Sequence, residues 1–245
     1  MDGGIVNLAF MKSSVFENLE LVRQQIAEAA TRAGRRIEEI ELIAVSKTQP
    51  PEAILEVLDA GQSVFGESRV QEAKAKIPLL PSRARWQLIG HLQSNKVRQA
   101  LPLFERIHSI DSLEIARDVE RIANELGLFP KVLLEVNVAG EGTKHGFKPE
   151  TLRAAMEELL AFGRVEIEGL MAIPPFAPEA EASRRYFAAL RTLRDQLSSE
   201  FRVSLPELSM GMSGDFAVAI EEGSTMVRVG TAIFGEREGK AWKPA

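Results

Sequence analysis

Lys47 is the residue of this chain whose type and position best suit covalent chemistry. It follows a largely apolar run at residues 40–45 that is typical of a buried strand, with Ser46 between. Burial at a strand end favours the neutral amine, which is the form that attacks an aldehyde and makes a Schiff base. A lysine there can equally pair with a carboxylate or extend its ammonium group to water. Position alone therefore leaves Lys47 as either a nucleophile or an ordinary cation.

Two short turns have the composition of phosphate-binding turns. Ser213-Gly214 and Gly230-Thr231 each combine a glycine with a hydroxyl side chain. Glycine lets backbone N–H groups approach an anion closely, and the N-terminus of a following helix adds to the attraction. Ordinary turn formation, with Ser213 capping a helix, explains the same residues. The turns predict a phosphate site, with a plain structural role as the alternative.

Arg228 interrupts an apolar run at residues 226–229 that otherwise suits a buried strand. A guanidinium inside a fold needs a partner, because an unpaired buried charge is costly. That partner is either an internal carboxylate such as Glu135 or the ring nitrogen of a bound heterocycle. The sequence does not choose between the two.

The composition excludes several kinds of site. The chain has 245 residues, no cysteine and a net charge of −5, which rules out disulfides and thiolate metal ligands. It has no basic block, so we expect no nucleic-acid partner. The histidines His91, His108 and His145 are not spaced as zinc ligands usually are, and we expect no metal. No leader pattern and no apolar stretch of roughly 20 residues is present, so we expect a cytoplasmic protein with no membrane contact.

The elements that must position these residues alternate regularly. A helical pattern at residues 17–33 precedes eight apolar runs typical of strands, separated by helical patterns. The predicted strands are 40–45, 64–66, 86–91, 106–110, 131–138, 165–173, 208–210 and 226–234, and the predicted helices between them are near 51–61, 69–77, 96–104, 112–126, 151–162, 179–199 and 216–222. No hairpin signal interrupts the alternation, which favours a parallel sheet.

Eight such units in about 200 residues predict an α/β fold, a single (β/α)8 TIM barrel with an extra N-terminal helix. The barrel domain is expected at residues 16–245, after an N-terminal extension at residues 1–15. A doubly wound open sheet is the alternative. Functional groups of such barrels gather at the C-terminal ends of the strands. Lys47 and Ser213-Gly214 come at the ends of the first and seventh predicted strands, and the eighth predicted strand carries Gly230-Thr231, so we expect them to share that face.

Ordered motifs along nearly the whole chain carry a resemblance to a known family. The chain resembles the YggS/PROSC family of pyridoxal phosphate homeostasis proteins. The matching stretches are residues 44–48, 65–67, 70–72, 89–96, 135–137, 144–146, 169–173, 208–215 and 223–235. One departure is Ser68-Arg69, which stands where the family usually has Asn-Tyr, and this puts a cofactor contact from the Asn position in doubt.

The resemblance implies a fold-type III barrel, like the N-terminal domain of alanine racemase, that binds pyridoxal 5'-phosphate. Lys47 would carry the cofactor as a Schiff base, and Arg228 would face the pyridine nitrogen. The full set of cofactor-binding residues implied is Lys47, Asn137, Met171, Ser213, Gly214, Arg228, Gly230 and Thr231.

Two functions fit such a cofactor site: a carrier that buffers or delivers pyridoxal phosphate, and a fold-type III amino-acid racemase. An arginine facing the ring nitrogen keeps it unprotonated and makes the ring a weak electron sink. The racemase also needs an opposing base that depends on a C-terminal β-domain and a dimer partner, and the chain ends at Ala245, soon after Gly235. We therefore expect a non-catalytic homeostasis protein, monomeric, with free amino acids and pyridoxal phosphate-dependent apoenzymes as possible partners.

Overall fold

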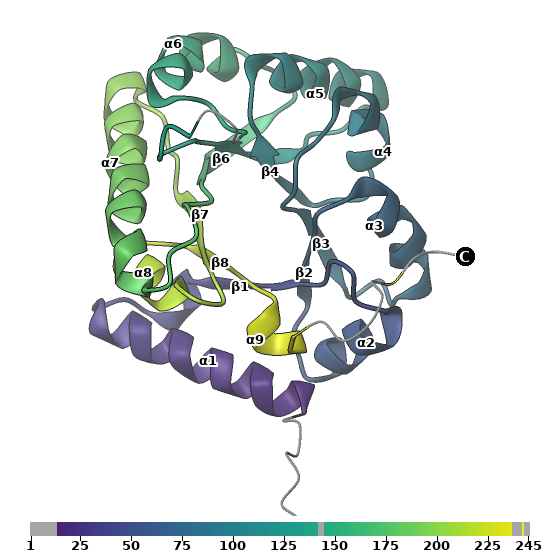
Figure 1. Cartoon of the computed structure of the whole chain (residues 1–245). Helices are drawn as coiled ribbons and strands as arrows, with labels where there is room; N and C mark the ends of the chain where they lie inside the picture. Colours follow the sequence, from purple (N-terminus) through teal and green to yellow (C-terminus); the bar gives the residue numbers. More distant parts are fainter. Residues whose placement is uncertain (1–13, 142–144, 237–241, 243–245) are drawn as a thin grey trace, which may run out of the picture.

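Eight parallel strands close into a barrel in sequence order, with β1 hydrogen-bonded to both β2 and β8. The structure is a computed structural model that describes residues 14–141, 145–236 and 242. The strands are β1 (Glu41–Val45), β2 (Val64–Glu67), β3 (Arg85–Leu88), β4 (Arg106–Ile110), β5 (Lys131–Glu135), β6 (Glu166–Met171), β7 (Glu207–Met212) and β8 (Met226–Val229). Figure 1 looks along this barrel. The predicted TIM barrel is confirmed, and the open doubly wound sheet is excluded.

Helices form the outer ring of the barrel (Figure 1). They are α1 (Val15–Arg32), α2 (Pro51–Asp59), α3 (Val70–Lys76), α4 (Val97–Ala100), α5 (Leu113–Leu126), α6 (Pro149–Leu160), α7 (Arg184–Phe201), α8 (Phe216–Glu221) and α9 (Thr231–Phe234). Local sequence sets their ends. The extra N-terminal helix α1 begins at a capping box between Ser14 and Glu17. Helix α5 begins after the Ser112 cap and ends at Gly127, whose φ of 67° suits glycine.

The end of the last strand differs from the sequence prediction. A strand was expected over residues 226–234, but β8 stops at Val229 and α9 follows. The apolar pattern persists into α9 because Ile233 is buried there, and its carbonyl accepts a hydrogen bond from the Asn18 side chain at 3.0 Å. The apolar pattern correctly predicted that this segment is buried, but it wrongly predicted that the whole segment is a strand. The fifth strand is also shorter than predicted, because the chain leaves the sheet after Glu135.

The interior of the barrel contains both charged and apolar side chains. At the N-terminal end, Arg106 reaches across to Glu168 at 2.6 Å and to Glu41 at 3.2 Å, and Lys131 donates to Glu168 at 2.6 Å. A small apolar cluster also lies inside, formed by Ile43, Val64, Leu133, Met171 and Met226. Outside the sheet, the strands and the helix ring share one large apolar core. The N-terminal end is thereby closed by ion pairs, and the C-terminal end carries the site.

Two predictions concern the ends of the chain and its surroundings. The predicted extension at residues 1–15 lies almost wholly outside the described residues, apart from Ser14 and Val15, and stays a prediction together with the domain boundary. Within the described part of the chain, no helix has the length and apolar character needed to cross a membrane.

Candidate functional site

Lys47 lies half-buried in the turn that follows β1, at the C-terminal end of the barrel. The next residue, Thr48, has a left-handed backbone with a φ of 67°, which costs a non-glycine residue about 1–2 kcal/mol. Its N–H donates to the Glu72 carboxylate at 2.5 Å, and its carbonyl accepts from the Trp242 N–H at 3.1 Å. These two bonds offset the strain and hold the turn that carries Lys47.

A buried ion cluster of Glu67, Glu72 and Lys76, here called the Lys76 cluster, supports this turn. Lys76 is fully buried, and its Nζ donates to Glu67 and Glu72 at 2.8 Å each and to the Ser46 carbonyl at 3.0 Å. The Ser46 hydroxyl donates to Glu67 at 2.7 Å. Burial raises the pKa of Glu67 despite the attraction of Lys76. The cluster ties the ends of β1 and β2 to α3, so three elements set the backbone beside Lys47.

The two glycine turns meet at the start of α9. The Ser213 hydroxyl accepts hydrogen bonds from the N–H groups of Gly230 at 3.2 Å and Ala232 at 3.3 Å. Gly214 and Thr231 are exposed, and a Cβ on Gly214 would meet no atom within 4 Å. Backbone N–H groups that converge on one oxygen, with open space beside them, form an arrangement that suits a phosphate group.

Barrel closure brings these turns to the strand that ends in Lys47. Ala44 of β1 lies opposite Val229 of β8. A Cβ on Gly230 would lie 3.4 Å from the Cβ of Val45, which is van der Waals distance. The structure therefore places the aldehyde-reactive candidate and the phosphate candidates on neighbouring strand ends.

Arg228 is buried in β8 and contacts the two preceding strands. Its Nη1 donates to the Ser209 carbonyl at 2.8 Å and to the Ser209 hydroxyl, and its Nη2 donates to the Ala172 carbonyl at 2.9 Å. Burial lowers the pKa of Arg228 to about 10, so the guanidinium is charged at neutral pH. Within the described residues it forms no hydrogen bond with Glu135 and none through Nε. The carboxylate pairing considered from the sequence is therefore not the arrangement found.

A chain of hydrogen bonds runs from Arg228 through the barrel. His108 lies with Nδ1 2.8 Å from the Ser209 hydroxyl and Nε2 2.7 Å from the Gln87 carbonyl oxygen, and the Gln87 amide donates to Glu41 at 2.9 Å. Burial and the charge of Arg228 hold the pKa of His108 well below its usual range, so the ring is neutral. Its Nε2 then carries the proton and donates it to Gln87. Each group in the chain from Arg228 to Glu41 therefore donates a hydrogen bond to the next group. This chain fixes the orientation of the guanidinium.

Glu135, at the end of β5, is a buried carboxyl that titrates near neutral pH. Burial raises its pKa to about 7, the negative charge of Asp111 adds to the shift, and the positive charge of Arg228 opposes it. The sequence suggested this residue only as a partner for Arg228.

Three further residues have distinct positions. Met171 is fully buried among the apolar side chains inside the barrel. Asn137 holds its own loop, because its amide donates to the Glu141 carbonyl at 2.7 Å and accepts from the Glu141 N–H at 3.2 Å. Ser68 follows β2, and a Cβ on Gly90 would lie 2.3 Å from the Ser68 carbonyl, so the backbones are in close contact there.

Sequence reasoning missed the residues that support this site. Lys76 and Glu72 stand four positions apart on one helix, a spacing that signals an ion pair but not its burial. His108 and Arg106 alternate on β4, which is the inward period of a strand. These two spacings were the available signals, and neither identifies the partner on another element.

Comparisons with known proteins agree with this geometry. Residues 18–238 match the family model of the alanine racemase N-terminal domain. The chain is 46% identical to a pyridoxal phosphate homeostasis protein of Aquifex aeolicus, over 91% of this chain and 98% of that protein. It is 42% identical to the Escherichia coli K12 protein of the same name, over 92% and 98%.

Solved structures show the same relationship. PipY of Synechococcus elongatus PCC7942, described with pyridoxal phosphate bound, is 42% identical and superposes with a TM-score of 0.80, over 91% of this chain and all of that chain. Alanine racemase of Clostridium difficile 630 is 18% identical with a TM-score of 0.71, over 92% of this chain and 61% of the racemase, which is a likeness of fold alone. This chain belongs to the alanine racemase N-terminal domain family and, within it, to the pyridoxal phosphate homeostasis proteins.

Proposed function

We propose that this protein binds pyridoxal 5'-phosphate at the C-terminal end of its barrel and acts in pyridoxal phosphate homeostasis, by buffering or delivering the cofactor. The observation that carries the proposal is the closure of β1 against β8, which sets the Lys47 turn beside the Ser213 and Gly230 turns. The names of the relatives at 46% and 42% identity and the cofactor bound to PipY support it.

The residues present fit this cofactor. Lys47 would hold the aldehyde as a Schiff base, and the backbone of Gly214, Gly230 and Thr231 with the Ser213 hydroxyl would hold the phosphate. The Nε–H of Arg228 would donate to the ring nitrogen, since the contacts described above use its other two nitrogens. Met171 and Asn137 are further proposed contacts. When bound, the cofactor supplies an aldehyde that exchanges between amines.

We further propose that the protein is a carrier and not a racemase. A guanidinium that is charged at neutral pH and oriented by the His108 chain would keep the pyridine nitrogen unprotonated. Such a ring stabilises carbanions poorly, which suits holding an amine without reacting further. Free amino acids and transiently bound apoenzymes are the proposed partners, and the protein is proposed to be a monomer.

The decisive experiment locates the Schiff base. Purified protein is incubated with pyridoxal phosphate, reduced with borohydride and mapped by peptide mass spectrometry. We expect a visible absorption band in the wild type, an adduct on the Lys47 peptide, and neither in Lys47→Ala. Lys96→Ala, which removes a lysine from the short 3-10 helix that follows β3, should keep both. An adduct on Lys96 or Lys144 would refute the assignment, and turnover of L- to D-amino acids at roughly 1 per second or faster would favour the racemase.

A further inference from the structure

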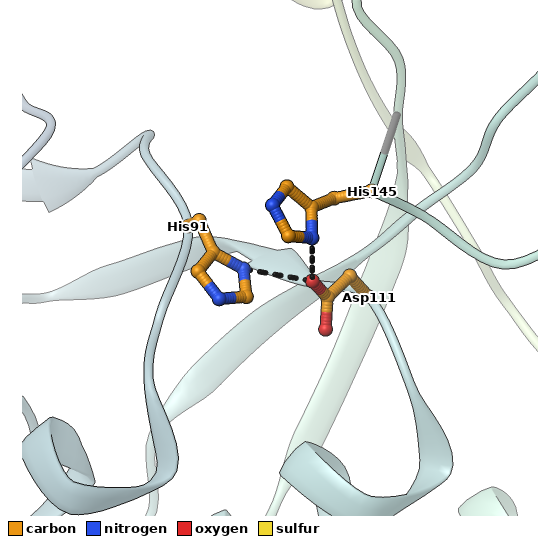
Figure 2. Close-up of side chains that lie close together, drawn as sticks. All are labelled: His91, Asp111 and His145. Atoms are coloured by element: carbon orange, nitrogen blue, oxygen red, sulfur yellow. Dashed lines mark hydrogen bonds and ion pairs between the residues drawn. The ribbon is translucent and has the colours of Figure 1, made fainter. Parts of the chain in front are cut away.

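Two of the three histidines converge on one carboxylate at the rim of the barrel. His91 follows β3, Asp111 follows β4 and His145 follows β5 in the chain. The Nδ1 atoms of His91 and His145 lie 2.8 Å and 3.3 Å from the same oxygen of Asp111, as Figure 2 shows. The two rings stack with their centroids 3.9 Å apart. Residues far apart in sequence thus form a single group, which is why their spacing gave no sign of it.

The backbone holds each member of this group in place. The carbonyl of Gly90, directly before His91, accepts a hydrogen bond from the Ser109 hydroxyl at 2.7 Å. Gly146, directly after His145, has a φ of 110°, and the next residue, Phe147, bonds to the backbone of Glu135 at 2.8 Å and Asn137 at 2.9 Å.

Asp111 itself stands between the last residue of β4 and the Ser112 cap of α5. Its side chain is only 7% exposed, whereas those of His91 and His145 are 37% and 60% exposed. Among the described residues, its hydrogen bonds and ion pairs are with these two imidazoles. The group therefore has a fixed, shielded anion and two accessible nitrogen donors.

We propose that His91, Asp111 and His145 bind a divalent transition-metal ion of the zinc, cobalt or nickel class. One ligand atom from each residue lies within 4.8 Å of the other two. The ligand atoms of a tetrahedral zinc ion lie about 3.3 Å apart, given bonds of about 2.0–2.2 Å. The His145–Asp111 separation matches this value, and the His91–Asp111 separation needs to open by about half an ångström.

The donor set selects the class of ion. Two imidazoles and one carboxylate favour zinc, cobalt, nickel, copper or ferrous iron, whereas magnesium and calcium favour oxygen ligands throughout. Three protein ligands leave coordination positions for water or a small ligand. The three residues line a surface pocket together with Gln93, Ser94 and Glu114.

The test measures metal binding by the Lys47→Ala protein. Zn²⁺ affinity is measured by competition with a chromophoric chelator, and Co²⁺ binding is followed by its visible spectrum. That background removes the Schiff base, because the cofactor and its amine adducts chelate such ions themselves. We expect one equivalent to bind. His91→Ala, Asp111→Asn and His145→Ala should each weaken binding at least about 10-fold, since residues that only support metal ligands already contribute about 10–100-fold. Millimolar Mg²⁺ should not compete.

The controls separate coordination from surface charge and from misfolding. Glu114→Gln removes an exposed carboxylate from the same pocket and should leave the affinity unchanged. His145→Ala alters the most exposed member, and an unchanged melting temperature would show that its effect is on the ion. No binding at about 100 µM Zn²⁺, or equal affinity in the Lys47→Ala parent and in both histidine variants made from it, would overturn the proposal. An equal loss in Glu114→Gln would also overturn it, because it would indicate diffuse attraction.

Discussion

The hydroxyls of Ser213 and Thr231 have different environments although both belong to the proposed phosphate turns. Ser213 already accepts two backbone N–H groups at the start of α9 and so organises the turn without any ligand. Thr231 is exposed and lies at the first position of that helix. A change at Ser213 would disturb the fold and the ligand together, whereas a change at Thr231 tests the ligand.

Thr231→Val should weaken pyridoxal phosphate binding while leaving pyridoxal binding nearly unchanged. Loss of one charge-assisted hydrogen bond costs about 1.5–3 kcal/mol, which corresponds to some tenfold or more in Kd. Parallel titrations of both ligands, followed by absorbance, measure the difference. Equal weakening of the two ligands would assign Thr231 a structural role and would move the phosphate site elsewhere.

The candidate residues could be found from the sequence because their types are unusual for their positions. Lys47 after an apolar strand and Arg228 within one are exceptions to a regular pattern, and exceptions can be recognised without coordinates. Ser209, His108 and Gln87 are ordinary strand residues until the barrel closes and joins them through its interior. Their role depends on contacts between distant strands, which no local pattern contains.

At the scale of elements, the turn after β1 depends on helix α3. The left-handed Thr48 is held by Glu72, and Glu72 is held by Lys76 of the same helix. The ring of Trp242 lies over Lys76, with Nζ 5.3 Å from its centroid. A change in α3 therefore reaches Lys47 through the backbone of its neighbours Ser46 and Thr48.

Lys76→Met should lower both stability and cofactor binding. Removing one partner of a buried ion pair typically costs about 3–5 kcal/mol, because Glu67 and Glu72 are left unpaired. The deficit should shrink at acidic pH, because burial raises the pKa of Glu67 and its protonation removes a buried charge that Lys76 no longer pairs. Urea unfolding at pH 5 and pH 8 and a pyridoxal phosphate titration measure these effects. Lys74→Met, an exposed lysine of the same helix, should change stability by less than about 0.5 kcal/mol. Full cofactor binding by Lys76→Met would show that the cluster does not position Lys47.

The elements themselves were predictable because each strand of the barrel is flanked by its own helix, and burial on both faces leaves a continuous apolar signal. The exception at β8 is instructive. Residues 226–234 are mostly apolar, but the chain turns into α9 at Gly230, where two N–H groups bond to Ser213. A partner in the turn after β7, seventeen positions away, decides the shape of that segment.

At the scale of the whole molecule, a buried glutamate at one end of the barrel has a lowered pKa, and one at the other end has a raised pKa. Near the N-terminal end, burial alone would raise the pKa of Glu168, but hydrogen bonds from Arg106 and Lys131 hold it below its usual value. At the C-terminal end, Glu135 has a pKa of about 7. Paired charges thus stabilise the N-terminal end, while Glu135, which has no side-chain hydrogen bond or ion pair among the described residues, weakens the fold above neutral pH.

Glu135→Gln should stabilise the cofactor-free protein at pH 8, and Glu168→Gln should destabilise it. The native Glu135 carboxyl binds a proton more tightly than the unfolded chain does, so its unfavourable contribution grows as the pH rises from 4.5 to 7. Glutamine removes about 2–3 kcal/mol of that cost. Glu168 contributes above pH 4.5, and its loss should cost about 1.5–3 kcal/mol. Urea unfolding of both variants at pH 4 and pH 8 measures the signs, and a destabilised Glu135→Gln at pH 8 would contradict this account.

Because β1 lies near the start of the chain and β8 near its end, the barrel can close only late in synthesis. Lys47 leaves the ribosome early and Thr231 late, with a delay of roughly 10–40 s at synthesis rates of about 5–20 residues per second. During that interval the growing chain contains Lys47 without the Ser213 and Gly230 turns that the finished barrel places near it. Under the proposed function, a nascent chain cannot withdraw cofactor from the cell, and the ability to bind the cofactor signals that synthesis has passed the last strand and the barrel has closed.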